Sequence, residues 1–458
     1  MGITKDLAAW VADVDYGGLT DAAIERVQVA TLDYLGCAVA GSTTETADKL
    51  RAFTSEADKD GGPSTVIGTP MRTAPPDAAL LNGTFGHAQD YDDVSFHMIG
   101  HPGVTILPAV LALAEATERS GAHAIAAYAA GYEVSTRLGY AMNAGGHYEK
   151  GWHATGTLGT MGAAGGAANI LGLSAEETAH ALGIAASMAA GLRQNFGRDT
   201  KPLHAGRAAQ NGVTAAMLAA RGFTADPDIL EAPFGFLSVY SGPDGSRVER
   251  LVPQENGEFE VAAPGFQTKI YPSCASTHTA LDAMLSLIAE HDIDASRVTD
   301  IDVAVVHLTP KILIHTNPTE GLQGKFSMQY CMARALTSRF LGVGHFTDEA
   351  VRDPGIRRLM GLVTMHVDDG LDAAWTADRP RPVILKVTLD DGKVLERRVD
   401  IPTGLPEKPA TAAQVEAKYR DLAVPVLGDG GAQRVIELTR DLRSLTDITV
   451  LMSACVAA

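Results

Sequence analysis

The sequence predicts a mainly α-helical protein built from a large all-helical domain and a smaller α+β lid domain. Three observations support this. Helical periodicity runs almost unbroken from residue 4 to about 265, strand-like alternation appears between about 265 and 402, and helical periodicity returns after Pro402. We therefore expect residues 1–265 together with 403–458 to form one discontinuous helical domain, and residues 266–402 to form the lid.

The first region has the spacing of amphipathic helices. Apolar residues recur three and four positions apart, and glycine or asparagine follows several of the segments. Ser174 and Glu177 form a capping-box pattern at the start of one of these helices. A stretch at 156–172 consists largely of Ala and Gly, which allows neighbouring helices to approach closely. The predicted helices include 21–41, 105–121, 122–145 and 175–190.

The second region contains short strands between helices. Apolar alternation around Asp391-Gly392 predicts a β-hairpin over 381–402, because Asp-Gly is a strong signal for a tight turn. The segment that begins at Gln267 also has a strand-like pattern and stops at Pro272. Further strands are predicted at 300–306 and 362–369, and helices at 275–290, 326–342, 412–423 and 432–445.

Composition and charge exclude several classes of function. The chain has 458 residues, 46% of them hydrophobic, and a formal net charge of −18. This negative charge opposes binding to nucleic acid or to anionic membranes, both of which require a basic surface. The four cysteines are far apart and form no CxxC pair, as expected for reduced thiols. The sequence starts without a signal-peptide pattern and has no apolar run of about 18 residues, so a cytoplasmic protein is expected.

One segment concentrates ionisable side chains. Residues 82–105 read NGTFGHAQDYDDVSFHMIGHPGVT and contain no lysine or arginine. These ionisable side chains can bind a metal ion, bind a substrate or face solvent. His97 and His101 have the i,i+4 spacing of helical metal ligands, but Gly100 and Pro102 interrupt a helix there and HExxH is absent. We therefore predict no metal. The ionisable residues are His87, Asp90, Asp92, Asp93, His97 and His101.

The sequence carries no signature of an organic or iron–sulfur cofactor. GTLGTMG is not a GxGxxG motif and follows no strand, and there is no P-loop. The single cysteines lack the spacing of iron–sulfur ligands. Nothing near Lys201 or Lys269 resembles a phosphate-binding cup for pyridoxal phosphate. We therefore expect the protein to need no cofactor.

A second cluster is basic. Arg198, Lys201, His204 and Arg207 gather at the start of a predicted helix, where Pro202 suits the first turn. A helix N-terminus already favours anions, and adjacent cations strengthen that preference. The pattern predicts a site for a carboxylate-bearing ligand; the alternative is an exposed basic helix start that pairs with nearby acids.

A third cluster lies in HYEKGWHATGT at 147–157. Tyr148 and His153 occupy a glycine-containing turn that leads into the small-residue helix. These two side chains are candidate proton donors, although a histidine in such a turn is more often structural.

The fourth cluster lies in QTKIYPSCASTHTALDA at 267–283. Lys269 precedes a helix whose first turn holds Cys274 and His278, and the alternative for Cys274 is a small buried side chain. Together the four segments supply acid–base groups and cationic anchors, with neither a redox group nor a nucleophile. That set suits removal of a proton next to a carboxylate.

The motifs at these positions resemble the MmgE/PrpD family. They are HAQDYDD…GHPG, GWHATGT, TKPLHAGRAAQNG, GFTADPDILEAPFGF and KIYPSCASTH, in that order. The family includes 2-methylcitrate dehydratases, cis-aconitate decarboxylases and an iminodisuccinate epimerase. The resemblance implies a cofactor-free homodimer with a large helical domain and an α+β lid. It places Asp90, His101, His153, Lys201 and Lys269 in the cleft between them.

Some positions depart from the patterns of particular family members. Cys274 stands where the decarboxylase-like pattern has histidine, Val94 where it has threonine, and Thr309-Pro310 where it has a nearby tyrosine. The DDTW run typical of the methylcitrate enzymes is also missing, because Val94 follows Asp93. Tyr148 matches the tyrosine of an epimerase-like HYxxGWH variant, in which a Tyr/Lys pair acts as opposed bases.

We expect a metal-independent lyase that dehydrates a small hydroxy-polycarboxylate resembling 2-methylcitrate. The alternatives are an epimerase that uses Tyr148 and Lys269, a cis-aconitate-type decarboxylase, and a non-catalytic carboxylate-binding dimer. The predicted catalytic residues are Asp90, His101, Tyr148, His153 and Lys269, and the predicted substrate-binding residues are Lys201, His204, Arg207 and Cys274.

Overall fold

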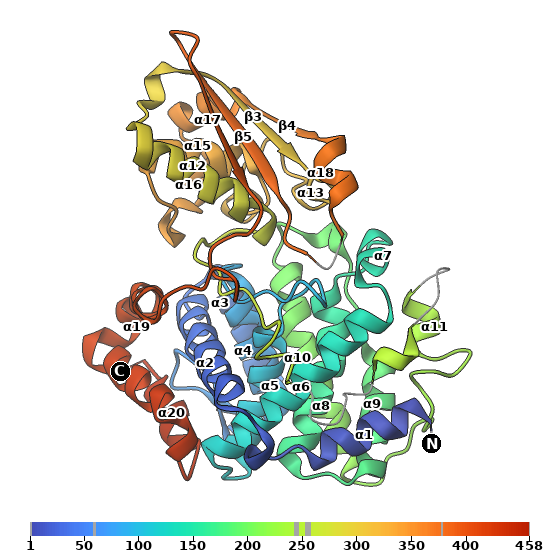
Figure 1. Ribbon diagram of the computed structural model, residues 1–458. Helices are drawn as coiled ribbons and strands as arrows, with labels where there is room; N and C mark the ends of the chain where they lie inside the picture. The colour runs from blue at the N-terminus through green and yellow to red at the C-terminus, as the bar shows by residue number, and fades with distance from the viewer. Residues whose placement is uncertain (1, 58–60, 242–246, 252–257, 377–378, 458) are drawn as a thin grey trace.

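The structure, a computed structural model, describes residues 2–457 except 58–60, 242–246, 252–257 and 377–378. It is mainly helical, with a small mixed sheet in the C-terminal region, which confirms the predicted fold class. Figure 1 shows the helical body below and the sheet with its helices above. Among the described helices, none is long and apolar enough to cross a membrane.

Helix α8 (Ala154–Leu171) lies at the centre of the helical body. Its small residues allow α6 (Gly121–Ala141) and α10 (Thr200–Ala219) to pack against it with backbones in close approach. A Cβ atom at Gly131 would lie 2.5 Å from the carbonyl oxygen of Gly162, too close for any side chain there. The Ala/Gly stretch at 156–172 therefore allows the close helix approach that the sequence predicted, and it forms most of a buried helix.

The remaining helices of the body surround this core. Helix α4 (Pro75–Ala88) packs on α10, and α5 (Gly103–Ala116) packs on both α4 and α8. The body also holds a short hairpin, β1 (Ser64–Thr65) with β2 (Arg72–Thr73), so the prediction of an all-helical domain was wrong in this detail. Further elements are α1 (Ile3–Asp13), α2 (Asp21–Gly41), α3 (Glu45–Ala57), α7 (Ala144–Glu149), α9 (Ala175–Met188) and α11 (Phe236–Ser241).

The sheet has the order β4-β3-β5-β6. Strand β3 (Val298–Val305) pairs in parallel with β4 (Val363–Val367) and antiparallel with β5 (Val383–Leu389). Strand β6 (Val394–Val399) completes the hairpin with β5 around Gly392, whose φ of 81° requires glycine. The segment 267–271 forms no strand, only an isolated bridge from Gln267 to Val94. The alternation of apolar and polar residues here belongs to an extended segment that contains Lys269 and pairs with no described strand.

Helices cover the sheet and form the rest of the lid. Helix α12 (His278–His291) packs against β5 and β6, and α15 (Met328–Ser338) packs against α12 and β4. The shorter lid helices are α13 (Leu308–Ile312), α14 (Gly321–Gly324), α16 (Asp348–Arg352), α17 (Pro354–Met360) and α18 (Asp369–Ala374).

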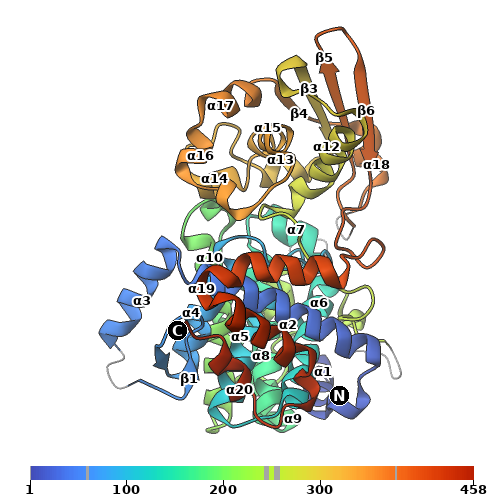
Figure 2. The same ribbon diagram turned by 90° about the vertical axis from the view of Figure 1, so that its left-hand side faces the viewer.

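After the sheet the chain returns to the body. Helix α19 (Ala412–Arg440), which breaks at Gly428, lies along α2 and is followed by α20 (Thr449–Ala454) (Figure 2). The buried Lys418 Nζ donates to Asp33 Oδ1 at 2.6 Å and to the carbonyl oxygens of Tyr91 and Lys269. Helix α19 thus fixes the backbone of two segments that carry predicted site residues. The exact domain boundaries stay a prediction.

Candidate active site

The loop between α4 and α5 carries the first cluster in a defined shape. Asp90 and Ile99 adopt left-handed backbone conformations with φ of 49° and 50°, and Ser95 pairs with Gly100 across the loop. Asp93 Oδ1 accepts a hydrogen bond from the backbone N–H of Gly103 and so caps the start of α5. Burial raises the pKa of Asp93 well above its ordinary value, and the hydrogen bond from Gly103 opposes part of that rise.

Asp90 is the centre of the site. Its Oδ1 accepts from Lys269 Nζ at 2.9 Å and from Lys201 Nζ at 3.1 Å, and all three side chains are buried. Burial alone would raise the pKa of Asp90, but the two ammonium groups bring it well below its ordinary value. Burial would lower the pKa of Lys269, and Asp90 and Asp92 together raise it instead. Both partners are therefore charged at neutral pH.

Two histidines complete this network through Asp92. His87 Nδ1 lies 2.9 Å from the Asp92 carboxylate and its Nε2 lies 2.7 Å from Lys201 Nζ, while His101 Nδ1 lies 3.0 Å from Asp92 Oδ2. The Asp92 carboxylate thus bonds two imidazoles. Burial lowers the pKa of His87 to about 3 and lowers that of His101, so both rings are neutral at pH 7.

His153, which directly precedes α8, and Tyr148 on α7 lie beside this cluster. His153 Nδ1 lies 3.0 Å from His204 Nδ1, and burial with nearby Lys201 holds the pKa of His153 well below its ordinary value. Burial likewise lowers the pKa of His204 to about 4. The ring of Tyr148 lies beneath the Arg193 guanidinium at 4.2 Å, and burial raises the pKa of its hydroxyl. At neutral pH His153 and His204 are therefore uncharged imidazoles, and the hydroxyl of Tyr148 is protonated.

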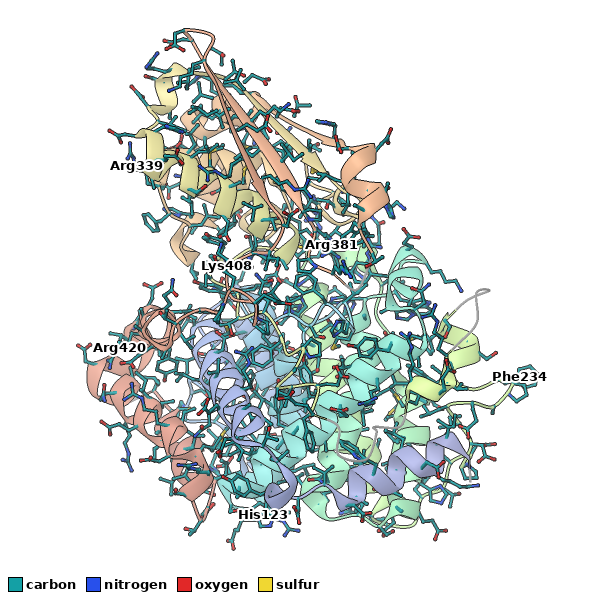
Figure 3. The ribbon with its side chains drawn as sticks, in the orientation of Figure 1. His123, Phe234, Arg339, Arg381, Lys408 and Arg420 are labelled. Atoms are coloured by element: carbon teal, nitrogen blue, oxygen red, sulfur yellow. The ribbon has the colours of Figure 1, made fainter. Side chains whose placement is uncertain are left out.

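Two cations from the lid were not predicted. Lys325 Nζ donates to the carbonyl oxygens of Gln89 at 2.6 Å and Pro272 at 2.9 Å, and burial lowers its pKa to about 7. Arg381 is buried where the lid meets the body (Figure 3), close enough to Tyr148 to oppose the rise in its pKa. Arg381 is the first residue of the predicted hairpin and Lys325 directly precedes the predicted helix 326–342, so neither position carried a local motif of its own.

Other predicted residues lie at the edge of the cluster or outside it. Cys274 is half-buried, and its backbone N–H donates to the carbonyl of Lys325. Arg207 is exposed and bonds Gln210, so the structure does not bring it to the predicted substrate-binding group. Arg207 lies six residues after Lys201 on α10, a spacing that turns it away from the face that Lys201 occupies. His97 Nδ1 lies 2.8 Å from the hydroxyl of Tyr140. The i,i+4 spacing of His97 and His101 therefore does not bring their rings together as a pair of metal ligands.

One group of donor atoms has the dimensions of a metal site. Donor atoms of His87, Asp90, Asp92 and His101 lie within 4.8 Å of one another. The ammonium groups of Lys201 and Lys269 already bond two of these residues, and a divalent cation beside them would meet two positive charges. The donors therefore fit the lysines that they contact better than they fit a metal.

Positive charge exceeds negative charge within this buried site. The ammonium groups of Lys201 and Lys269 balance the two carboxylates of Asp90 and Asp92. The buried guanidinium of Arg381, near Tyr148 and Cys274, adds one net positive charge before Lys325 is counted. In a protein of net charge −18, such a site is built for an anion. Neutral imidazoles and a protonated phenol surround it, which supplies both proton acceptors and proton donors.

Comparison with known proteins identifies the family. Residues 5–249 match the MmgE/PrpD N-terminal domain and residues 271–444 match the MmgE/PrpD C-terminal domain. The chain belongs to the MmgE/PrpD family. This confirms the resemblance seen in the motifs, and the chain is therefore an MmgE/PrpD enzyme.

Curated MmgE/PrpD relatives align with nearly the whole chain. Cis-aconitate decarboxylase from Homo sapiens is 31% identical, with 98% of this chain and 93% of the relative covered. The enzymes of the same name from Mus musculus and Aspergillus terreus are 28% and 26% identical, with 98% of this chain and 92% and 95% of the relatives covered. The family relationship thus extends over both domains of these enzymes.

Proposed function

We propose that this MmgE/PrpD enzyme is a lyase that dehydrates a small hydroxy-polycarboxylate of the 2-methylcitrate type. The observation that supports it most strongly is the buried excess of positive charge around Asp90, which provides cations for more than one substrate carboxylate. Cations beside a carboxylate stabilise the charge that develops when the neighbouring carbon loses a proton. The same ion pairing disfavours loss of that carboxylate as carbon dioxide.

The elimination needs a base that removes the proton from carbon and an acid that protonates the leaving hydroxyl, and the site contains both. His153 is a neutral base that accepts the proton from the carbon next to the carboxylate, and the electron pair of the C–H bond forms the new double bond. As the C–O bond of the hydroxyl breaks, Tyr148 or Lys269, both protonated, donates a proton so that water leaves. His101, held by Asp92, orients the substrate beside Asp90.

Decarboxylation of a cis-aconitate-like acid is the second candidate, and the similarity to curated decarboxylases favours it. In that reaction a C–C bond breaks, carbon dioxide leaves and the remaining electron pair is protonated by Lys269 or Tyr148. Cys274, Val94 and Thr309-Pro310 differ from the decarboxylase-like pattern. The epimerase alternative requires Tyr148 or Lys269 to begin as a base, whereas both have raised pKa values in the free site.

The test is proton NMR in deuterium oxide of the EDTA-treated protein with 2-methylcitrate, citrate, cis-aconitate and iminodisuccinate. We expect an olefinic product from a hydroxy acid. Loss of a carboxyl group from cis-aconitate would replace this proposal with the decarboxylase, and deuterium uptake without a new product would replace it with the epimerase. His153→Gln should abolish turnover, whereas His123→Gln, at the far end of the body (Figure 3), should preserve it.

We also propose that residues 266–402 move as a lid against 1–265 and 403–458, and that two copies form a homodimer. The catalytic side chains are buried, so the substrate needs an opening to reach them. Small-angle scattering should report a decrease in radius of gyration when substrate binds, and light scattering should give twice the chain mass of 48.0 kDa. A radius of gyration that substrate leaves unchanged would contradict the lid movement, and a mass of one chain would contradict the homodimer. The cytoplasmic location stays a prediction.

A further inference from the structure

A second polar cavity lies between the helical body and the lid, apart from the catalytic cluster. Its volume is about 520 Å³. Its walls come from the loop 96–99, from the end of α6 with the residues that follow it, from Arg247 and Arg250, and from Thr376 and Arg379 of the lid. None of the catalytic side chains around Asp90 lines it.

Three arginines give this cavity its charge. Arg247, Arg250 and Arg379 all line it, and all three are exposed. Within the part of the chain that the structure describes, no carboxylate forms an ion pair with any of their guanidinium groups, although acidic residues outnumber basic ones 55 to 37 in the whole sequence. Three guanidinium groups around one cavity repel one another, and a bound anion would relieve that repulsion.

The backbone holds these arginines in place. The N–H of Arg247 donates to the carbonyl of Ala141 at the end of α6, and the carbonyl of Arg250 accepts from Arg137. The carbonyl of Arg379 accepts from the indole N–H of Trp375 at 3.1 Å. Two arginines are thus fixed to the body and one to the lid, so the cations stand on opposite sides of the boundary.

The opposite wall is aromatic and polar. The rings of His97 and Tyr140 lie 4.6 Å apart and are joined by the hydrogen bond between Tyr140 and His97 Nδ1. A cavity of about 520 Å³ is within the range of roughly 300–1,000 Å³ typical of organic ligands and far exceeds the needs of a single inorganic ion. Guanidinium groups bind phosphate and carboxylate through paired N–H donors.

We infer that this cavity binds a small multivalent anion with phosphate or carboxylate groups, and that the anion bridges the lid to the helical body. Arg379 precedes Arg381 of the catalytic cluster by two residues, and His97 shares its loop with Asp90 and His101. An anion held by Arg247, Arg250 and Arg379 therefore stabilises the closed arrangement of the segments that carry the catalytic groups. This inference does not depend on which acid the enzyme converts.

Isothermal titration calorimetry of the full chain tests it with two probes, inorganic pyrophosphate and tricarballylate. The wild type should bind at this site, and the Arg247→Ser/Arg250→Ser variant should bind at least tenfold more weakly. Arg379→Ser should also weaken binding and keeps the test decisive if the double variant fails to fold. Arg339→Asn, which removes an exposed arginine from the outer face of the lid (Figure 3), is the matched control and should bind as the wild type does.

The two probes separate the sources of the anion. Loss of pyrophosphate binding in the double variant assigns a phosphate ligand, and loss of one of two tricarballylate sites assigns a carboxylate ligand. Tricarballylate binding that is unchanged in the double variant belongs to the catalytic site. If neither probe distinguishes the arginine variants from wild type and Arg339→Asn, the inference is wrong. Turnover measured separately decides the proposed reaction, so the two can fail independently.

Discussion

Replacement of Asp90 by asparagine tests the central electrostatic argument. The amide has the shape of the carboxylate but no charge, so the buried ammonium groups of Lys201 and Lys269 lose their common counter-charge. Removal of one partner from a buried pair costs about 3–5 kcal/mol. Because the amide oxygen still accepts one hydrogen bond, we expect Asp90→Asn to lower the free energy of unfolding by about 3 kcal/mol at pH 7.

The cost should depend on pH in a defined direction. In the wild type the raised pKa of Lys269 keeps its stabilising contribution until the pH rises through that pKa, above 10.5. In Asp90→Asn only the more weakly acting Asp92 is left to oppose burial, so the pKa of Lys269 falls from its wild-type value. The destabilisation is therefore full at low pH and is relieved as the pH rises through this lowered pKa. The difference between the two proteins should therefore be largest near pH 7 and shrink towards pH 10.

Urea unfolding followed by circular dichroism between pH 7 and 10 measures this difference. Asp292→Asn is the matched control, because Asp292 pairs with Arg339 at 2.7 Å but both side chains are exposed. Its loss should change the unfolding free energy by less than about 1 kcal/mol. If the two asparagine variants unfold at the same urea concentration at pH 7, the Asp90 site is not the desolvated ion cluster described above.

Three further changes have defined outcomes. Tyr148→Phe should lower kcat by about 10²-fold or more with little change in KM if the phenol donates a proton, and an unchanged kcat would remove it from the reaction. Lys418→Met should cost about 3–5 kcal/mol of unfolding free energy, and addition of Asp33→Leu should recover most of it; urea titration of both checks this. The pKa of Lys325 is about 7 in the folded protein and higher in the unfolded chain, so unfolding takes up a proton between about pH 7 and 10. Over that range the unfolding free energy of the wild type should rise by roughly 1.4 kcal/mol per pH unit relative to that of Lys325→Met. A difference independent of pH would show that Lys325 keeps its proton.

The order of helices and strands could be predicted from the sequence because the spacing of apolar residues follows the buried face of each element. Residues 21–41 form α2 without a shift at either end, and the Asp391-Gly392 turn closes the β5–β6 hairpin. The segment around Lys269 was misread because it alternates without a neighbouring strand to pair with. Its extended chain is held by single bonds from loops and from Lys418, which no local pattern encodes.

The residues of the candidate site were predictable only where they occurred in dense local patterns. Asp90, His101 and Lys201 were recognised as parts of clusters, and the fold brings them together. Arg207 belonged to the same basic cluster as Lys201, yet helical geometry turns it to solvent. Lys325 and Arg381 reach the site from distant lid segments, and their burial depends on how the lid sits on the body.

The position of α19 has a consequence for how the protein is made. The ribosome produces α2 early and α19 near the end, with the four-stranded sheet synthesised in between. Among the described residues, the ion-pair partner of Asp33 on α2 is Lys418 of α19. A nascent chain therefore carries an uncompensated carboxylate until translation is nearly finished. A product of premature termination before residue 418 would retain Asp90, Lys201 and Lys269 but expose the α2 surface that α19 covers, which makes it a natural substrate for chaperones and proteases.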